Sequence, residues 1–528
     1  MKIKFLSIIL ILVASVSCSE WLDVYPDSEI TSEKVFEDEE GYYSALAGLY
    51  VKMTADDLYG FELTSGLLDY MGGNVYVGSG NYLTYHANYF YDNAYYASYV
   101  APLQFPALNF YRGGIYTDAT DGQLDDWWTG LYSIIANANV LIETVKEEDA
   151  SMFEDGVKDL VLAEAMAVKA YIHLDLVRMF QVPYLDADGK TEARIPYMEN
   201  MDGLQFVPSA TTDEILDKVD ADLAYAAELM KDVDPISSGK SYYAQMFSSN
   251  RQHKLNYYAV KALQARSFLY RGKNQEAYDA AMEVINAADG IGVHFITDAE
   301  MATLDSDNVP VNRNCYMENL FAIRKDDLSD TFYSTAIGYS CTYGTFGRMA
   351  TNPWLNYGES SGVVYFNWAQ SDIRYSLWKQ PGTSSLTSGM IAKYYHTSTL
   401  AADEALYPTS AASLLKLGEV YLIAAEAAAE AVSVAEAVRL LNVLQTARGA
   451  ALFSGSDKDS FSQEILYEYR REMLGDGQLF YANKRRNEPL LHTLFQTGDT
   501  GTPYYFTMTK DRYTPSTPNS EYNGGRTY

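Results

Sequence analysis

The stretch that decides the fold is residues 411–450, AASLLKLGEVYLIAAEAAAEAVSVAEAVRLLNVLQTARGA. Its apolar residues recur every three or four positions in two runs, one on each side of Val432 and Ser433. Each run therefore predicts a helix with one apolar face, and Leu414 is placed on the first helix. Gly449 follows the second run and is typical of a helix C-cap. Two antiparallel helices cannot bury both apolar faces alone, so the pair requires neighbouring helices.

The same stretch carries part of the tetratricopeptide spacing, in which small residues stand where two helices cross closely. Gly418 and Ala437 fit this pattern, whereas Glu430 stands where the consensus has alanine. A clearer pair covers residues 254–289, where five positions match the spacing: Ala265, Phe268, Gly272, Ala277 and Ala281. Further periodic runs predict helix pairs over about 122–185, 211–289 and 411–448. His173 lies in one of them and is interpreted as a satisfied core or boundary residue.

Composition excludes several classes of function. The 528 residues carry a net charge of −31, which argues against binding to nucleic acid and against electrostatic attraction to anionic lipid. The three cysteines have no C-x-x-C spacing and the six histidines are scattered, so we expect no zinc site. No G-x-S-x-G, H-E-x-x-H or P-loop spelling occurs, and we expect no cofactor.

The first residues, MKIKFLSIILILVASVSC, combine two lysines, a short apolar run and small residues. This pattern predicts a secretory signal over residues 1–17, because the run is too short to span a bilayer. Cys18 directly follows and resembles the lipidated first residue of a bacterial lipoprotein, although Ser15 replaces the usual leucine. The alternative is ordinary cleavage beside a stray cysteine. Acyl chains on Cys18 would hold the chain at a membrane through a lipid anchor only.

Two regions, about 60–120 and 290–410, lack a helical period and are rich in Gly, Asn and aromatic residues. Nine of the thirty residues 70–99 are Tyr, against 46 in all 528, so aromatic rings are concentrated there. Such rings stack on sugars or peptide side chains, and amides bind hydroxyls. The alternative is that they pack as a layer over the helices. The predicted ligand-binding residues are Asn81, Tyr82, Tyr85, Tyr89, Tyr343, Trp354 and Tyr357.

Seven ordered blocks between residue 18 and about residue 522 resemble the SusD-like (RagB/SusD) family. The blocks include W-L-D after Cys18, A-E-A at Ala163, E-x-x-F at Glu318, D-x-R at Asp372 and a charged run at 464–485. The resemblance implies one domain over residues 18–528, mostly α. A tetratricopeptide-like helix-pair scaffold would carry a ligand-binding face of irregular loops and short strands.

The resemblance also implies a role. Family members are lipid-anchored at the cell outer membrane, face the exterior and bind oligomeric nutrient. They deliver it to a SusC-like TonB-dependent transporter, so the expected ligand is an oligosaccharide. A peptide ligand, as in the RagB branch, stays open. A glycosidase would require two carboxylates about 5–10 Å apart in a cleft, and a purely structural scaffold would bind neither ligand.

Charged residues at 464–485 invite an active-site interpretation, but Glu468, Arg471 and Glu472 have the spacing of ion pairs on a helix surface or between helices. We favour ion pairs over an active site for these residues. The exported location permits a disulfide between Cys315 and Cys341, and two thiols remain the alternative. A Ca²⁺ site at residues 305–307 lacks an EF-hand spelling, so no metal site is predicted.

Overall fold

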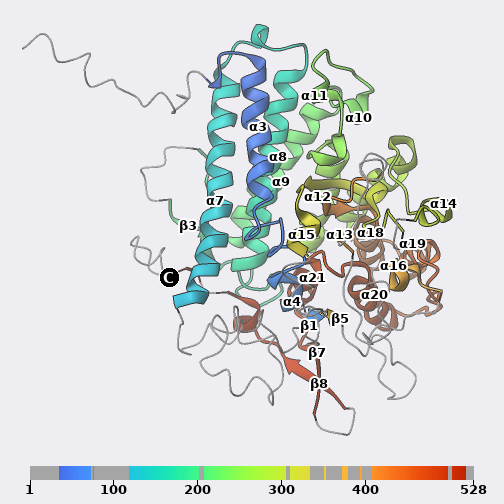
Figure 1. Cartoon of the computed structure of the whole chain (residues 1–528). Coiled ribbons are helices and arrows are strands. Elements are labelled where there is room, and N and C mark those ends of the chain that lie inside the picture. The colour runs from blue at the N-terminus through green and yellow to red at the C-terminus, as the bar shows by residue number, and fades with distance from the viewer. Residues whose placement is uncertain are drawn as a thin grey trace, which may run out of the picture.

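The computed structural model describes residues 35–72, 75–76, 118–200, 207–304, 310–332, 350–351, 371–377, 393–394, 407–497, 502–515 and 517–518. Helices dominate these residues, and the strands are short and paired two by two. The predicted fold class, mostly α with short strands, is confirmed (Figure 1). Whether residues 18–528 form a single domain stays a prediction.

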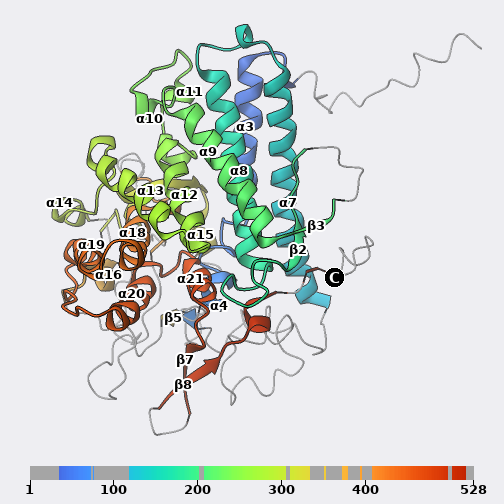
Figure 2. The same ribbon diagram turned by 180° about the vertical axis from the view of Figure 1, so that it is seen from behind.

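Four long helices lie side by side in one half of the molecule, as Figures 1 and 2 show. They are α3 (Glu39–Met53), α7 (Asp118–Glu147), α8 (Val157–Phe180) and α9 (Thr212–Met230). Nearly every residue of α8 is buried, including the polar residues Glu164, Lys169, His173, Asp175 and Arg178. A helix that is apolar on every side lies inside a bundle, which explains why α8 packs against α3, α7 and α9. Thr211 and Glu214 form the capping box that begins α9.

The second half stacks shorter helices on this bundle (Figure 2). Helix α12 (Tyr257–Tyr270) turns at Gly272, whose φ of +74° favours glycine, into α13 (Asn274–Ala287). Helix α13 packs on α18 (Leu417–Ala431), which pairs with α19 (Val434–Ala447). Then follow α20 (Lys458–Glu472) and α21 (Gln478–Arg486). Successive hairpins therefore bury one another's apolar faces, as the spacing predicted.

One helix boundary was predicted wrongly. Residues Ala411–Lys416, including Leu414, form strand β6, which pairs antiparallel with β4 (Asn319–Arg324). All six residues of β6 are buried. A short apolar run that is buried on both faces cannot be told from the start of a buried helix by its period.

The remaining elements are short. Three further antiparallel pairs are β1 (Val75–Tyr76) with β5 (Ala350–Thr351), β2 (Ala193–Pro196) with β3 (Ser209–Thr211), and β7 (Leu490–Thr497) with β8 (Thr502–Thr507). The short α-helices are α4 (Leu67–Met71), α10 (Pro235–Ser238), α11 (Gln245–Ser248), α14 (Asp298–Met301), α15 (Leu328–Phe332) and α16 (Ile373–Leu377). No helix in the described ranges is long and apolar enough to cross a bilayer.

Candidate functional site

The predicted ligand-binding residues, Asn81, Tyr82, Tyr85, Tyr89, Tyr343, Trp354 and Tyr357, all lie outside the described residues. The same holds for Cys18, Cys341 and residues 305–307. Cys315 is described as a buried thiol, and burial raises its pKa to about 12. This thiol is free, which favours the alternative of two thiols over a disulfide with Cys341.

The flanks of the two aromatic regions meet in the structure. Val75 lies opposite Thr351, and Tyr76 lies opposite Ala350, in the antiparallel pair of β1 and β5. Strand β1 leads toward residues 81–89, and β5 lies between residues 343 and 354 in the chain. Two segments that are about 275 positions apart in the sequence are thereby joined at one place.

Residues 65–72, which precede β1, are also hydrogen-bonded to the C-terminal part of the chain. Asp69 of α4 is fully buried, and its carboxyl group accepts hydrogen bonds from the backbone N–H groups of Gly475 at 3.1 Å and Gly477 at 3.4 Å. Burial raises the pKa of this group to about 8. Ser65 donates to the Gly475 carbonyl at 2.6 Å, and the Asn483 amide donates to the Gly72 carbonyl at 3.3 Å. These bonds hold α4, and with it the start of β1, against the turn before α21.

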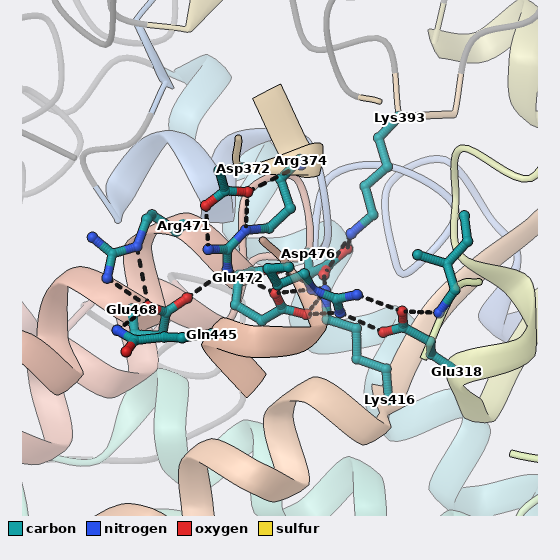
Figure 3. A network of polar contacts seen from close by, with 12 residues as sticks. Glu318, Asp372, Arg374, Lys393, Lys416, Gln445, Glu468, Arg471, Glu472 and Asp476 are labelled. Atoms are coloured by element: carbon teal, nitrogen blue, oxygen red, sulfur yellow. Dashed lines mark hydrogen bonds and ion pairs between the residues drawn. The ribbon is translucent and has the colours of Figure 1, made fainter. Parts of the chain in front are cut away.

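A buried ion network lies at the centre of the C-terminal half (Figure 3). The Arg374 guanidinium makes two bonds to Asp372, at 2.7 and 3.0 Å, and reaches Glu468 at 2.6 Å and Glu472 at 2.9 Å. All four side chains are closed to solvent. The D-x-R block at the start of α16 is thus joined to the charged run on α20.

The network continues from Glu472 to two more elements. Arg448, just after α19, donates to Glu472 and, through both terminal nitrogens, to Glu318 at 2.6 and 2.5 Å. Lys416, at the end of β6, reaches Asp476 at 2.8 Å and the Glu472 carbonyl at 2.7 Å. Three blocks of the family resemblance, at Glu318, at Asp372 and at residues 464–485, therefore converge on one buried cluster.

Asp476 ends the network on the side of Lys393. The Lys393 ammonium points at this carboxylate in Figure 3 and lies 2.6 and 2.7 Å from its two oxygens. The Tyr394 hydroxyl donates to the same group at 2.9 Å. Lys393 and Tyr394 are therefore tied to the turn before α21.

Glu468 and Glu472 of the network are held in their ionised form. Burial alone would raise the pKa of a carboxyl, but Arg374 and Arg471 lower that of Glu468 to about 2. Arg448 and Lys416 hold the pKa of Glu472 well below its ordinary value. Carboxylates that keep their charge in this way cannot donate a proton near neutral pH. The network is a structural clamp, and the predicted ion pairs are confirmed: Arg471 pairs with Glu468 along α20, and Glu468 and Glu472 pair with Arg374 and Arg448 of other elements. The pair along α20 is buried and does not lie on an exposed helix surface.

Sequence reasoning missed several members of this cluster. Arg448 and Lys416 stand alone at the ends of a helix and a strand, so no local spacing marked them. Gly418 did carry a signal, but for another reason than helix crossing: a Cβ there would collide with the Glu472 carboxylate. His173, in contrast, is fully buried and hydrogen-bonded to Lys169 and Met198, as interpreted from the sequence.

Within the described ranges, no group of three or more His, Cys, Asp or Glu side chains is arranged to hold a metal ion. An open cavity lies elsewhere, between α3, the segment 246–254 and the end of β4. It is lined by both aromatic and basic side chains, and its chemistry differs from that of the sealed network.

The sequence matches known protein families and relatives along most of its length. A family profile described as "Starch-binding associating with outer membrane" matches residues 20–246, and a profile described as the SusD family matches residues 333–525. SusD-like protein P2 of Formosa agariphila is 25% identical over 488 residues, which cover 86% of this chain and 83% of that protein.

Solved structures agree on the fold. A SusD-like carbohydrate binding protein from Bacteroides vulgatus superposes with a TM-score of 0.64 at 16% identity, covering 92% of this chain and 96% of that one. A SusD superfamily protein from Bacteroides thetaiotaomicron superposes with a TM-score of 0.59 at 19% identity, covering 92% and 97%. With both halves matched by profiles and the helical scaffold shared, the chain belongs to the SusD-like family.

Proposed function

We propose that this chain is a lipid-anchored outer-membrane protein that binds oligosaccharide outside the cell. It passes the ligand to a SusC-like TonB-dependent transporter and does not cut it. The family profile's description, starch-binding and associated with the outer membrane, supports both the ligand class and the location. The name of the Bacteroides vulgatus structure, a carbohydrate binding protein, supports the ligand class as well.

The pairing of β1 with β5 carries the proposal, because it limits where the aromatic residues can go. Trp354 follows Thr351 by three positions, and Tyr82 follows Tyr76 by six. An extended chain spans at most about 3.6 Å per residue, so three and six residues reach at most roughly 11 and 22 Å. Both rings can thus serve one ligand. The site comprises Asn81, Tyr82, Tyr85 and Tyr89 from one segment, and Tyr343, Trp354 and Tyr357 from the other.

A binding role without catalysis fits the carboxylates of the described residues. Those that cluster most closely, Glu468, Glu472 and Asp372, are sealed from solvent and held by Arg374. A glycosidase requires one protonated and one ionised carboxyl facing a substrate cleft. The carboxylates bound to Arg374 cannot be reached by a substrate, and they do not take up a proton near neutral pH. They therefore cannot perform this chemistry.

The lipid anchor at Cys18 gives the body freedom to meet a transporter. Seventeen positions separate Cys18 from Val35, the first described residue. Such a tether reaches up to about 60 Å when extended. The helical body can therefore stand clear of the bilayer while its lipid chains remain inserted.

The test uses the full chain, purified in detergent, against a panel of neutral and acidic oligosaccharides and a panel of peptides. Calorimetry is expected to give saturable heat with at least one oligosaccharide and none with the peptides. A reducing-sugar assay on the bound glycan is expected to stay at background over hours. Saturable heat with peptides alone would reassign the ligand, and sustained sugar release would make the protein an enzyme.

A further inference from the structure

A cavity of about 300 Å³ opens between α3, the segment 246–254 that leads into α12, and the end of β4. Small-molecule sites in proteins measure about 300–1,000 Å³, so this one has room for a ligand the size of one sugar ring. Polar and apolar residues share its walls: Tyr43, Leu46, Ala47, Tyr50, Val51, Thr54, Met246, Ser249, Asn250, His253, Lys254, Ile323, Arg324 and Pro408.

The charge of these walls contrasts with that of the chain. The lining includes two basic side chains, Lys254 and Arg324, together with His253, and among the described residues it includes no Asp or Glu. The whole chain has 70 acidic against 39 basic residues. A cavity whose charged walls are all basic, in so acidic a protein, favours an anionic ligand over a cationic one.

Lys254 is the deepest of these charges, at 8% exposure. Its ammonium donates to the Met246 carbonyl at 2.6 Å and lies 4.5 Å from the centre of the Tyr43 ring. Among the described residues, no carboxylate comes within ion-pair distance of it, and desolvation lowers its pKa. An ammonium has three N–H donors, so the carbonyl leaves donors for a ligand. Desolvation of the ammonium costs free energy, and the charges of Glu164 and Asp234 offset part of that cost from a longer distance. A bound anion in direct contact would offset more of it.

The acidic groups behind the cavity are already engaged. Glu164 and Asp234 are fully buried, and Arg251 binds them at 2.6 and 2.8 Å. The Tyr50 hydroxyl donates to Glu164 at 2.8 Å and accepts from the backbone N–H of Leu255 at 3.0 Å. This layer fixes the backbone on both sides of Lys254, so the ammonium is held in place before any ligand arrives.

We propose that this cavity is a second carbohydrate site, which takes a sugar bearing a carboxylate, of the hexuronate class. Lys254 binds the carboxylate, and Arg324, which also pairs with Asp326 at 3.0 Å, assists it. Ala47, Met246 and Pro408 cover the sugar ring. The inference rests on described residues only, and it stands whether or not the aromatic loop residues bind glycan. An acidic sugar could come from a free monosaccharide or from the end of an acidic oligosaccharide, since both present the same group.

Calorimetry on the full chain in detergent tests the site with sodium glucuronate, with glucose as the neutral match. Glucuronate is expected to bind at least about tenfold more tightly than glucose, because a charge-assisted hydrogen bond is roughly twice as strong as a neutral one. Lys254→Met should weaken glucuronate binding about tenfold or more. Lys52→Met is the matched control, because Lys52 lies on α3 outside the cavity and bonds Ser133; it should leave binding unchanged.

Two further variants keep the test decisive. Ala47→Phe fills the cavity without removing a charge, so it should abolish glucuronate binding even if Lys254→Met lowers the melting temperature. Combined Tyr82→Ala and Trp354→Ala should leave glucuronate binding intact. Equal binding of glucuronate and glucose, equal loss in the two lysine variants, or loss in the loop variant would each overturn the proposal. Tri-glucuronate that binds more tightly than free glucuronate, and is weakened equally by Lys254→Met, would assign the site to chain ends.

Discussion

The Arg374 guanidinium lies 2.9 Å from the Glu472 carboxylate, although the two residues are 98 positions apart. Neither side chain is open to solvent. The contact joins the short helix α16 to the last residue of α20, and through Arg448 it extends to Glu318 at the start of β4. A segment with little helix of its own is thereby tied to the helical scaffold.

Replacing Glu472 by Gln should lower the free energy of unfolding by about 3–5 kcal/mol, the usual cost of removing one partner from a buried ion pair, because the network then holds an uncompensated positive charge. Glu472 is the shared partner of Arg374, Arg448 and Lys416, so its loss leaves three cations without their common anion. Urea denaturation followed by circular dichroism measures the change.

Glu464→Gln is the matched control for this variant. Glu464 lies on the same helix and accepts from Arg471, but its side chain is partly exposed and Arg471 keeps Glu468 as a second partner. We expect a loss of about 1 kcal/mol or less. Equal losses in the two variants would mean that burial adds nothing to the network's contribution.

His173 should make the stability of the protein depend on pH. Its ring nitrogens interact with the Lys169 carbonyl at 2.9 Å and with the backbone N–H of Met198 at 3.1 Å, and burial lowers its pKa to about 3. The unfolded chain binds this proton near pH 6.5 and the folded chain does not. The contribution of His173 is therefore complete above pH 6.5 and is lost as the pH falls toward 3, with a slope of up to about 1.4 kcal/mol per pH unit.

His173→Gln removes the titrating ring, so its unfolding free energy should fall less steeply than that of the wild type between pH 6.5 and 4.5. Chemical denaturation at half-unit steps of pH measures both slopes. The carboxylates of the ion network contribute mainly below about pH 4.5, because that is where the unfolded chain begins to bind their protons. Parallel curves for the two proteins would show that His173 is protonated in the folded state.

The helices could be predicted because their signal is local. Apolar residues at three- and four-residue spacing mark α12, α13, α18 and α19, and a capping box marks the start of α9. Strand β6 could not be separated from α18, since the pattern lacks a break where Lys416 ends one element and Leu417 begins the next. What decides that boundary is the pairing with β4, about 90 residues earlier.

The ion network and the cavity depend on contacts between distant segments. The run on α20 predicted ion pairs, but Arg448 and Lys416 became visible as partners only once β4, β6 and α19 met. Nothing in the sequence distinguishes Lys254 from an exposed lysine. Its burial follows from α3 lying across it, with Tyr50 and Leu255 bonded over 205 positions. Burial of a charged residue by a distant segment leaves no periodic pattern in the sequence.

The pairing of β1 with β5 predicts an engineered cross-link. Val75→Cys and Thr351→Cys, made in a Cys341→Ser background, should form a disulfide on mild oxidation. Opposed residues of antiparallel strands have Cα atoms about 4.5–5.5 Å apart, within the range that a disulfide spans. Mass spectrometry of a digest without reductant detects the joined peptides. Because the strands are already paired, glycan affinity should be the same in the oxidised and reduced forms; absence of the joined peptide would contradict the pairing.

Combined Tyr82→Ala and Trp354→Ala should weaken oligosaccharide binding while leaving the melting temperature nearly unchanged. Two stacking rings contribute about 1–3 kcal/mol together, which raises Kd roughly five- to 150-fold. Tyr243→Ala is the matched control, because this tyrosine is 96% exposed on the helical scaffold and far from β1 and β5 in the chain. Calorimetry and thermal melting of all three proteins separate the cases. A large fall in melting temperature would place the two rings in the core, and equal weakening by Tyr243→Ala would show that the glycan contacts exposed aromatic side chains without a defined site.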